Sequence, residues 1–211
     1  MSSTLLAVTE PESRQDRKRR TRQALLDAAL DLLADRAMTG LSLREVTRAA
    51  GVVPTAFYRH FASMDDLGVA LVEQCMRTLR AVLRRARRSG AAMITDSVAV
   101  LAEQVRAAPA HFRFLVRERP GGIPAVRAAI ATELRLLAAE LATDLGRLPV
   151  MAEWETDDLR MAADLMVSAM LATVMALVEA EEFDEPEVVD VAARQLRLIA
   201  LGIERWRPET P

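Results

Sequence analysis

The chain has 211 residues, 51% of them hydrophobic, so it is long enough to bury a sizeable core, and disorder over most of its length is excluded. Its formal net charge of −2 does not by itself indicate a nucleic-acid partner, but bases crowd residues 14–22 and acids dominate residues 151–190. Such an uneven distribution is typical of a DNA-binding end joined to a solvated second domain.

Composition also limits the fold class and the compartment. Glycine is sparse, alanine and leucine are abundant, and no long run alternates between apolar and polar residues, so we expect an all-α fold. The single cysteine, Cys75, excludes an intrachain disulfide. Residues 1–9 do not resemble a secretory signal, and the uncharged run Leu165–Val178 is shorter than the roughly 20 residues that a membrane-crossing helix needs. We therefore expect a soluble, cytoplasmic protein.

The first predicted elements are an arm and a long helix. We expect residues 1–13 to form a disordered arm. A helix should follow over about Asp16–Arg36, because apolar residues recur on one face as far as Leu33. Its arginine-rich start could lie along a phosphate backbone, and the alternative is a solvated basic tail.

The stretch Leu41–Phe61 reads as two short helices joined by a sharp turn. Ser42 and Glu45 have the spacing of a capping box at the start of the first helix. Gly51 should end that helix in the left-handed conformation, and Pro54 should open the second helix. The second helix is predicted to point Phe57 and Phe61 at a core. This pattern is typical of a helix-turn-helix, whose second helix enters the DNA major groove.

The opposite side of the second helix is the main candidate binding surface. Threonine and alanine are short enough for close approach and can contact a thymine methyl group. Longer polar side chains can contact guanine or phosphates, and the start of the preceding helix can hold another phosphate. The candidate DNA-binding residues are Ser42, Arg44, Thr55, Ala56, Tyr58, Arg59 and His60. The alternative for Tyr58 and His60 is that they only pack against the domain.

These residues carry a resemblance. The segments LSLREV, AAGV and FYRHF, within roughly Arg20–Leu71, resemble the DNA-binding domain of the TetR family of bacterial transcriptional regulators. The segments PTAFYRHFASMDDLG and FRFLVRERPGG resemble, more narrowly, the subgroup that represses unsaturated fatty-acid synthesis and desaturation and responds to acyl-coenzyme A. The resemblance implies a three-helix DNA-binding domain, residues 14–62, and a helical ligand-binding and dimerisation domain, residues 63–211. Many relatives have a phosphate-binding lysine where this chain has Met64.

The second domain is predicted to be a series of helices. A connector helix should begin near Ser63 and run to Arg88, and its arginines should face solvent or a partner. Ser89-Gly90 should break the chain, and RPGGIP, Arg119–Pro124, reads as a loop. The remaining predicted helices are Ala91–Ala107, one beginning at Pro109, Ala125–Leu145, about Thr156–Glu179 and Glu185–Trp206, with a connector at Leu148–Glu153.

The last two predicted helices are candidates for self-association. Thr156–Glu179 is apolar nearly all round, more than a domain of this size can surround alone. We therefore expect a homodimer through a four-helix interface, as the resemblance also implies. The candidate interface residues are Ala169, Ala172, Ala176, Leu196, Ile199 and Ile203.

A ligand pocket is the least determined prediction. Methionines cluster on the penultimate helix, and methionine adapts to flexible apolar ligands. The candidate ligand-binding residues are Phe112, Leu115, Arg117, Trp154, Met166 and Met170, with plain core or surface arginine as the alternative. The role of Arg117 and its neighbours Arg113 and Arg119, which would meet the phosphates of coenzyme A, comes mainly from the resemblance.

Catalytic chemistry finds no support in the sequence. The two histidines, His60 and His111, have no cysteine or carboxylate at metal-ligand spacing, and Cys75 reads as a buried, inert thiol. We expect no metal, no cofactor and no enzyme activity. The sequence predicts a DNA-binding repressor, homodimeric on a palindromic operator, whose effector is a long-chain acyl-coenzyme A or fatty acid. Two alternatives stay open: a repressor of an efflux or catabolic gene with another effector, and a helical enzyme.

Overall fold

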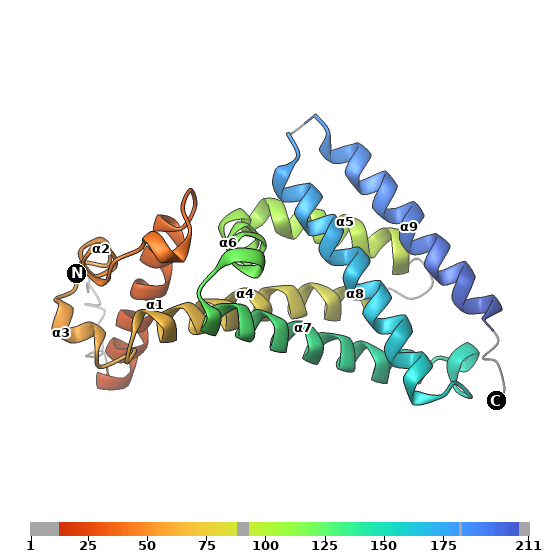
Figure 1. Cartoon of the computed structure of the whole chain (residues 1–211), viewed down its shortest axis with the longest axis horizontal. Coiled ribbons are helices and arrows are strands. Elements are labelled where there is room, and N and C mark those ends of the chain that lie inside the picture. The colour runs from red at the N-terminus through yellow and green to blue at the C-terminus, as the bar shows by residue number, and fades with distance from the viewer. Residues whose placement is uncertain (1–12, 88–92, 182, 207–211) are drawn as a thin grey trace, which may run out of the picture.

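The chain folds into helices along its described length. The computed structural model in Figure 1 describes residues 13–87, 93–181 and 183–206, and none of these residues is in a β-strand. The all-α expectation is therefore confirmed. The predicted arm lies outside the described residues except for Ser13, whose Oγ accepts the Asp16 amide and caps the first helix. The predicted break at Ser89-Gly90 also lies outside them.

A small N-terminal domain forms one end of the molecule (Figure 1). It contains α1 (Arg14–Leu32), the short 3-10 helix η1 (Met38–Gly40), α2 (Leu43–Ala49) and α3 (Pro54–Phe57). Helix α1 ends before the predicted Arg36, because the chain turns at Leu33 and Arg36 Nε donates back to the Leu32 carbonyl at 3.1 Å. The side chains of Leu25, Leu26, Val46 and Phe57 are completely buried, and they hold the helices around one core.

Helix α4 (Met64–Arg87) leaves this domain and enters the second one. Ser63 Oγ accepts the Asp66 amide at 3.1 Å, so the helix begins where the sequence predicts. Arg80 pairs with Glu133 at 2.7 Å and Glu140 at 3.3 Å, both on α7 (Pro124–Leu145). The prediction that this arginine faces solvent or a partner is thus wrong, because α7 supplies two carboxylates; the side chains of residues 81–88 lie outside the described ones.

The only thiol of the chain lies on α4. Cys75 is 1% exposed and packs in the large core. Burial raises the pKa of its thiol to about 12, so the thiol stays protonated at neutral pH.

The second domain also contains α5 (Met93–Ala107), α6 (Pro109–Gly121), the 3-10 helix η3 (Pro149–Met151), α8 (Thr156–Glu179) and α9 (Glu185–Arg205). The loop predicted over Arg119–Pro124 is confirmed only at Gly122 and Ile123, because α6 continues to Gly121 with Pro120 inside it and α7 begins at Pro124. Pro120 lies near the helix end, where its missing amide removes one hydrogen bond, and the Gly122 amide still closes the last turn on the Glu118 carbonyl at 3.0 Å.

Helix α8 combines a buried face with an exposed apolar face. With 24 residues it is long and apolar enough, by length and composition alone, to cross a membrane. Within the fold it packs against α5, α6, α7 and α9, so Ala163, Thr173 and Leu177 are buried. Its other side leaves Met161 and Leu165 about half exposed. The apolar composition therefore comes from a core face and a second face that a single chain does not cover.

Candidate DNA-binding surface and ligand cavity

The junction between α2 and α3 has the local geometry that the sequence predicts. Ser42 Oγ accepts the Glu45 amide at 3.3 Å, and Glu45 Oε2 accepts the Ser42 amide at 3.0 Å, which forms a complete capping box. Gly51 has a φ of 66°, the left-handed conformation that ends α2. Pro54 is the first residue of α3. These three local features fix the angle at which α3 is presented.

Helix α3 is shorter than predicted. It spans Pro54–Phe57, and the residues up to His60 form a turn that closes with the Phe61 amide donating to the Phe57 carbonyl at 3.0 Å. Phe57 and Phe61 are 0% and 4% exposed, with ring centroids 5.5 Å apart. Arg22 lies over the Phe61 ring at 4.9 Å. The two phenylalanines thus anchor the segment and leave its other side free.

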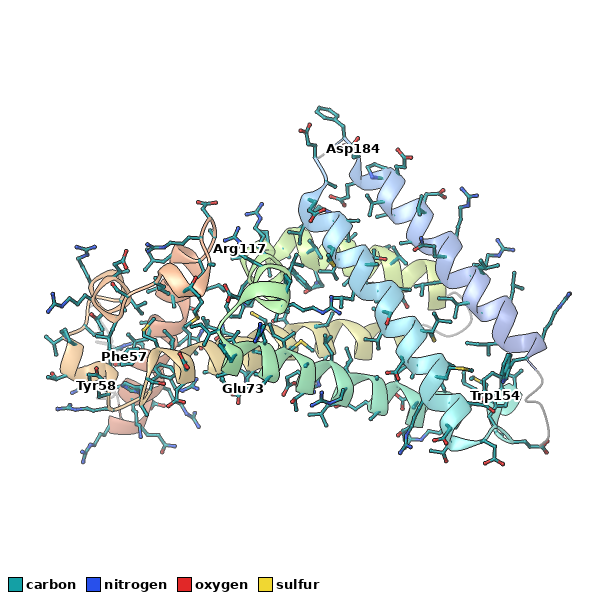
Figure 2. The ribbon with its side chains drawn as sticks, in the orientation of Figure 1. Phe57, Tyr58, Glu73, Arg117, Trp154 and Asp184 are labelled. Carbon is teal, nitrogen blue, oxygen red and sulfur yellow. The ribbon has the colours of Figure 1, made fainter. Side chains whose placement is uncertain are left out.

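The predicted DNA-binding side chains of the α3 segment lie away from its anchored side, and Arg44 lies on α2. Arg44, Thr55 and Arg59 are exposed, Tyr58 is 62% exposed, and Ala56 and His60 are partly buried. This exposure argues against the alternative that Tyr58 only packs, although its ring lies nearly perpendicular to that of Phe57 with the centroids 5.6 Å apart. Figure 2 shows Tyr58 at the outer end of the domain. Val53, which the sequence analysis did not single out, is 64% exposed two residues before Thr55.

Ser42 differs from the rest of this set. Its hydroxyl donates to Glu45 Oε2 at 2.6 Å, so it has no hydrogen left for a phosphate. Hydrogen bonds from the Ser42 side chain, Arg36 and the Ser42 backbone lower the pKa of Glu45 to about 2 and keep the carboxylate ionised. The ionised Glu45 carboxylate beside Ser42 would repel a phosphate. Ser42 therefore acts in the structure as a helix cap.

A basic concavity lies next to the exposed face of α3. It is lined by Arg14, Arg17, Lys18 and Thr21 of α1 together with Ala56, Arg59 and His60. His60 Nδ1 is buried there without a hydrogen-bond partner among the described residues. Burial lowers the pKa of His60, and the nearby charges of Lys18, Arg22 and Arg59 lower it further. The basic start of α1 and the end of α3 thus form one positively charged surface, which suits a phosphate backbone.

A small apolar cavity lies in the second domain, between α4, α6, α7 and α8. Its volume is about 40 Å³. Apolar side chains line it, including Phe112, Leu115, Leu134 and Met170, and Arg119 is the only charged residue in the lining. Sites for drug-sized ligands occupy roughly 300–1,000 Å³, so the helices must separate before such a ligand can enter.

Two family models match the chain. The model described as bacterial regulatory proteins of the tetR family matches residues 25–71, and the model described as the tetracyclin repressor-like C-terminal domain matches residues 91–202. The second match alone covers more than half of the 211 residues. The chain belongs to the TetR family. TetR-family proteins are transcriptional regulators and not enzymes, and this one is a transcriptional regulator.

Solved structures of several other proteins share the fold. The fatty acid degradation regulator FadR from Bacillus halodurans aligns with a TM-score of 0.69 at 15% identity, over 94% of this chain and 100% of its own. A TetR-family regulator from Streptomyces coelicolor gives 0.68 at 20% identity, over 89% and 97%. The multidrug binding protein EbrR, complexed with imidazole, gives 0.60 at 22% identity, over 88% and 96%.

The predicted pocket residues of this TetR-family regulator fall into two groups. Phe112, Leu115 and Met170 line the cavity. Trp154 and Met166 lie elsewhere, packed on a separate cluster around Met151 at the far end of α8, and Figure 2 shows Trp154 at the end opposite the DNA-binding domain. Arg117 also lies away from the cavity, because its guanidinium donates to the carbonyls of Leu33 and Ala34. The charged residue at the cavity is Arg119.

The predicted dimer residues lie mostly along the exposed side of α8 and α9. Ala172 and Ala176 line a groove between the two helices, and Ile199 and Ile203 line a second groove. Ala169 is partly buried on α8. Leu196 differs, because it is 5% exposed in the protomer's own core with Val98 and Ala192. The exposed apolar residues of α9 are instead Val191, Leu198 and Leu201.

Proposed function

We propose that this TetR-family regulator is a homodimeric repressor that binds a palindromic operator. A small apolar effector with an acidic group either releases the repressor from the operator or strengthens its binding there. The observation that carries the DNA-binding part is the α3 segment. Its apolar side is anchored by the buried Phe57 and Phe61, while Thr55, Tyr58 and Arg59 are exposed next to the basic concavity of α1. That arrangement provides both base contacts and phosphate contacts.

The dimer part of the proposal rests on the exposed side of α8 and α9. Met161 and Leu165 on α8 and Leu198 and Leu201 on α9 are between 48% and 72% exposed. Exposed apolar residues contiguous over two helices mark an association surface. A twofold pairing there would place two α3 segments on one side of the dimer, where half-sites about 34–36 Å apart suit successive major grooves.

The effector part rests on the chemistry of the cavity lining. Twelve of the thirteen lining residues are apolar, and Arg119 is the charged one. A slender apolar chain with a carboxylate or phosphate head would match this lining, whereas a cationic drug would meet an arginine. We therefore favour a long-chain fatty acid or its coenzyme A thioester over the effectors of a drug-pump regulator. The effector can shift DNA binding only by its difference in affinity for the closed and opened cavity.

Selection of bound DNA from a random pool tests the operator. The expected result is an inverted repeat whose half-sites are about one helical turn apart. Selected sequences without twofold symmetry would contradict the homodimer, and no enrichment would contradict DNA recognition itself.

The DNA-binding surface is tested by two substitutions on the selected operator. Arg44→Ala should weaken binding to all sequences and reduce the salt slope by about one, because it removes a phosphate contact. Thr55→Ala should instead change the preferred base at one position in each half-site. If neither variant alters binding, the DNA-binding surface has been placed on the wrong residues.

Calorimetric titration with saturated and unsaturated fatty acids and acyl-coenzyme A tests the effector. Binding should be lost in Leu134→Trp, which fills the cavity, and kept in Leu136→Trp, two residues along α7 on its exposed side. Arg119→Gln should weaken the binding of fatty acids more than the binding of the matching alcohols. Absence of heat with every acyl compound would remove this effector class and leave the operator result standing.

A further inference from the structure

Helix α6 has two faces that serve different parts of the molecule. Phe112, Leu115, Val116 and Arg119 line the ligand cavity. Phe114 packs in the core that includes Leu25 and Leu26 of α1, and Arg117 and Glu118 bond to the N-terminal domain. The residues of each face recur at helical spacing, so both faces belong to one rigid element. Any displacement of the cavity face is therefore a displacement of the contact with the DNA-binding domain.

Arg117 supplies a cation to the end of α1. Its Nη1 donates to the Leu33 carbonyl at 3.0 Å and its Nη2 to the Ala34 carbonyl at 3.2 Å. The last carbonyls of a helix lack intrahelical donors and carry partial negative charge, and α1 has no basic residue of its own in its last turn. Figure 2 shows Arg117 on the side of α6 that faces this domain. The guanidinium thus stabilises the closed contact between the domains.

Glu118 lies in the same contact but is poorly satisfied. Its side chain is 1% exposed, and its Oε1 accepts the Met38 amide of η1 at 2.7 Å. Its Oε2 is buried without a hydrogen-bond partner among the described residues. A buried carboxylate that lacks full compensation opposes burial, and opening of the contact would let water reach it. The charge of Glu118 therefore favours the open contact, whereas Arg117 favours the closed one.

We infer that Arg117 and Glu118 are positioning residues for operator binding, acting as an opposed pair that keeps the contact between α6 and the DNA-binding domain reversible. Arg117 holds the α1 end against α6, and the buried charge of Glu118 keeps that closed state from becoming permanent.

The test is amide hydrogen exchange of residues 36–41 in the full-length protein, without DNA or effector. Arg117→Ala should speed exchange of the Met38 amide about tenfold, because two charged hydrogen bonds that close the contact are lost. Glu118→Gln should slow it, because an amide oxygen still accepts the Met38 amide while the buried charge is gone. A purely structural role would make both substitutions speed exchange, and that result, or no change in either, overturns the inference.

Controls on the same helix separate the pair from general effects on α6. Arg113→Ala removes an exposed arginine one turn earlier and should leave exchange at Met38 unchanged. The Met38 amide of Arg117→Lys should exchange at a rate between those of wild type and Arg117→Ala, because an ammonium cannot bond both carbonyls as a guanidinium does. This comparison decides the role of Arg117 even if Glu118→Gln does not fold; a lysine variant equal to the alanine variant counts against the inference.

A second readout rests on the proposed function. On an operator selected from a random pool, Arg117→Ala and Glu118→Gln should shift affinity in opposite directions, with Arg113→Ala unchanged. Opposite exchange effects with unaltered operator affinity would show that the contact does not position the DNA-binding domain. If no operator is found, the proposed function fails, and the exchange results still decide whether the two residues oppose each other.

Discussion

At the scale of single residues, Gly51 determines how the chain leaves α2. A Cβ built there meets no atom within 4 Å, so space is not what requires glycine. Glycine is required by the φ of 66°, because a residue with a side chain is strained in the left-handed region.

Gly51→Ala should therefore lower the free energy of unfolding by about 1 kcal/mol, as measured by urea denaturation. Gly40→Ala is the matched control, since its Cβ also meets open space and its φ is not in the left-handed region. Equal effects of the two substitutions would mean that conformation at Gly51 is not the cause.

At the same scale, we expect His60 to make operator binding depend on pH. In the free protein, burial and the charges of Lys18, Arg22 and Arg59 hold its pKa below the ordinary value. Operator phosphates would neutralise those charges and raise the pKa, so binding should take up a proton. Operator affinity should then increase as the pH falls below about 6.5, the ordinary histidine pKa.

Fluorescence anisotropy across pH 5.5–8 would measure this linkage, and His60→Gln should flatten the curve. His111→Gln is the comparison, since His111 lies away from the DNA-binding surface, near Gln74 of α4. An unchanged pH dependence in His60→Gln would assign the proton to another group.

At the scale of elements, α4 crosses η1 and α7 at a glycine. A Cβ on Gly68 would lie 2.6 Å from Val126 Cγ2 and 3.0 Å from the Met38 sulfur. Both neighbours are buried, so they cannot turn out into solvent.

Gly68→Ala should therefore destabilise the protein by about 1–3 kcal/mol, the range for overpacking a core. Adding Val126→Ala should recover part of the loss, because it removes the closest contact. If the double variant loses as much free energy of unfolding as the two single variants lose together, helix packing at this crossing is not the cause.

The elements also show what the sequence can specify. The capping box, Gly51 and Pro54 were predictable, because each acts on backbone groups within a few residues. The continuation of α6 through Pro120 was not, because glycine and proline near a helix end look the same as in a loop. The target of Arg117 lies 84 residues away in the chain, and no local spacing indicates such a contact. Trp154 and Met166 have the large apolar side chains that suit a pocket, but residue type does not tell which neighbours a side chain meets.

At the scale of the whole molecule, the exposed side of α8 and α9 is the surface through which we propose that the protein dimerises. Leu165 is 54% exposed and lines a groove with Leu198 and Ile203. Leu165→Glu should weaken the homodimer at least tenfold, because a charge would be buried between the protomers.

Sedimentation over a range of concentrations would measure the dissociation constant of the dimer. Leu136→Glu is the control, since Leu136 is 49% exposed on α7, away from both grooves. If both variants dissociate equally, or neither does, the interface lies elsewhere. Operator affinity should fall only in the variant that loses the dimer.

The buried thiol of Cys75 has a practical consequence. Because a thiolate is the form that oxidants and electrophiles attack, a sulfur with a pKa of about 12 does not respond to them at neutral pH. Cys75 is thus a poor target for oxidative modification in this regulator. The same inertness means that a fluorophore or spin probe can be attached to one introduced surface cysteine while the native one stays in place.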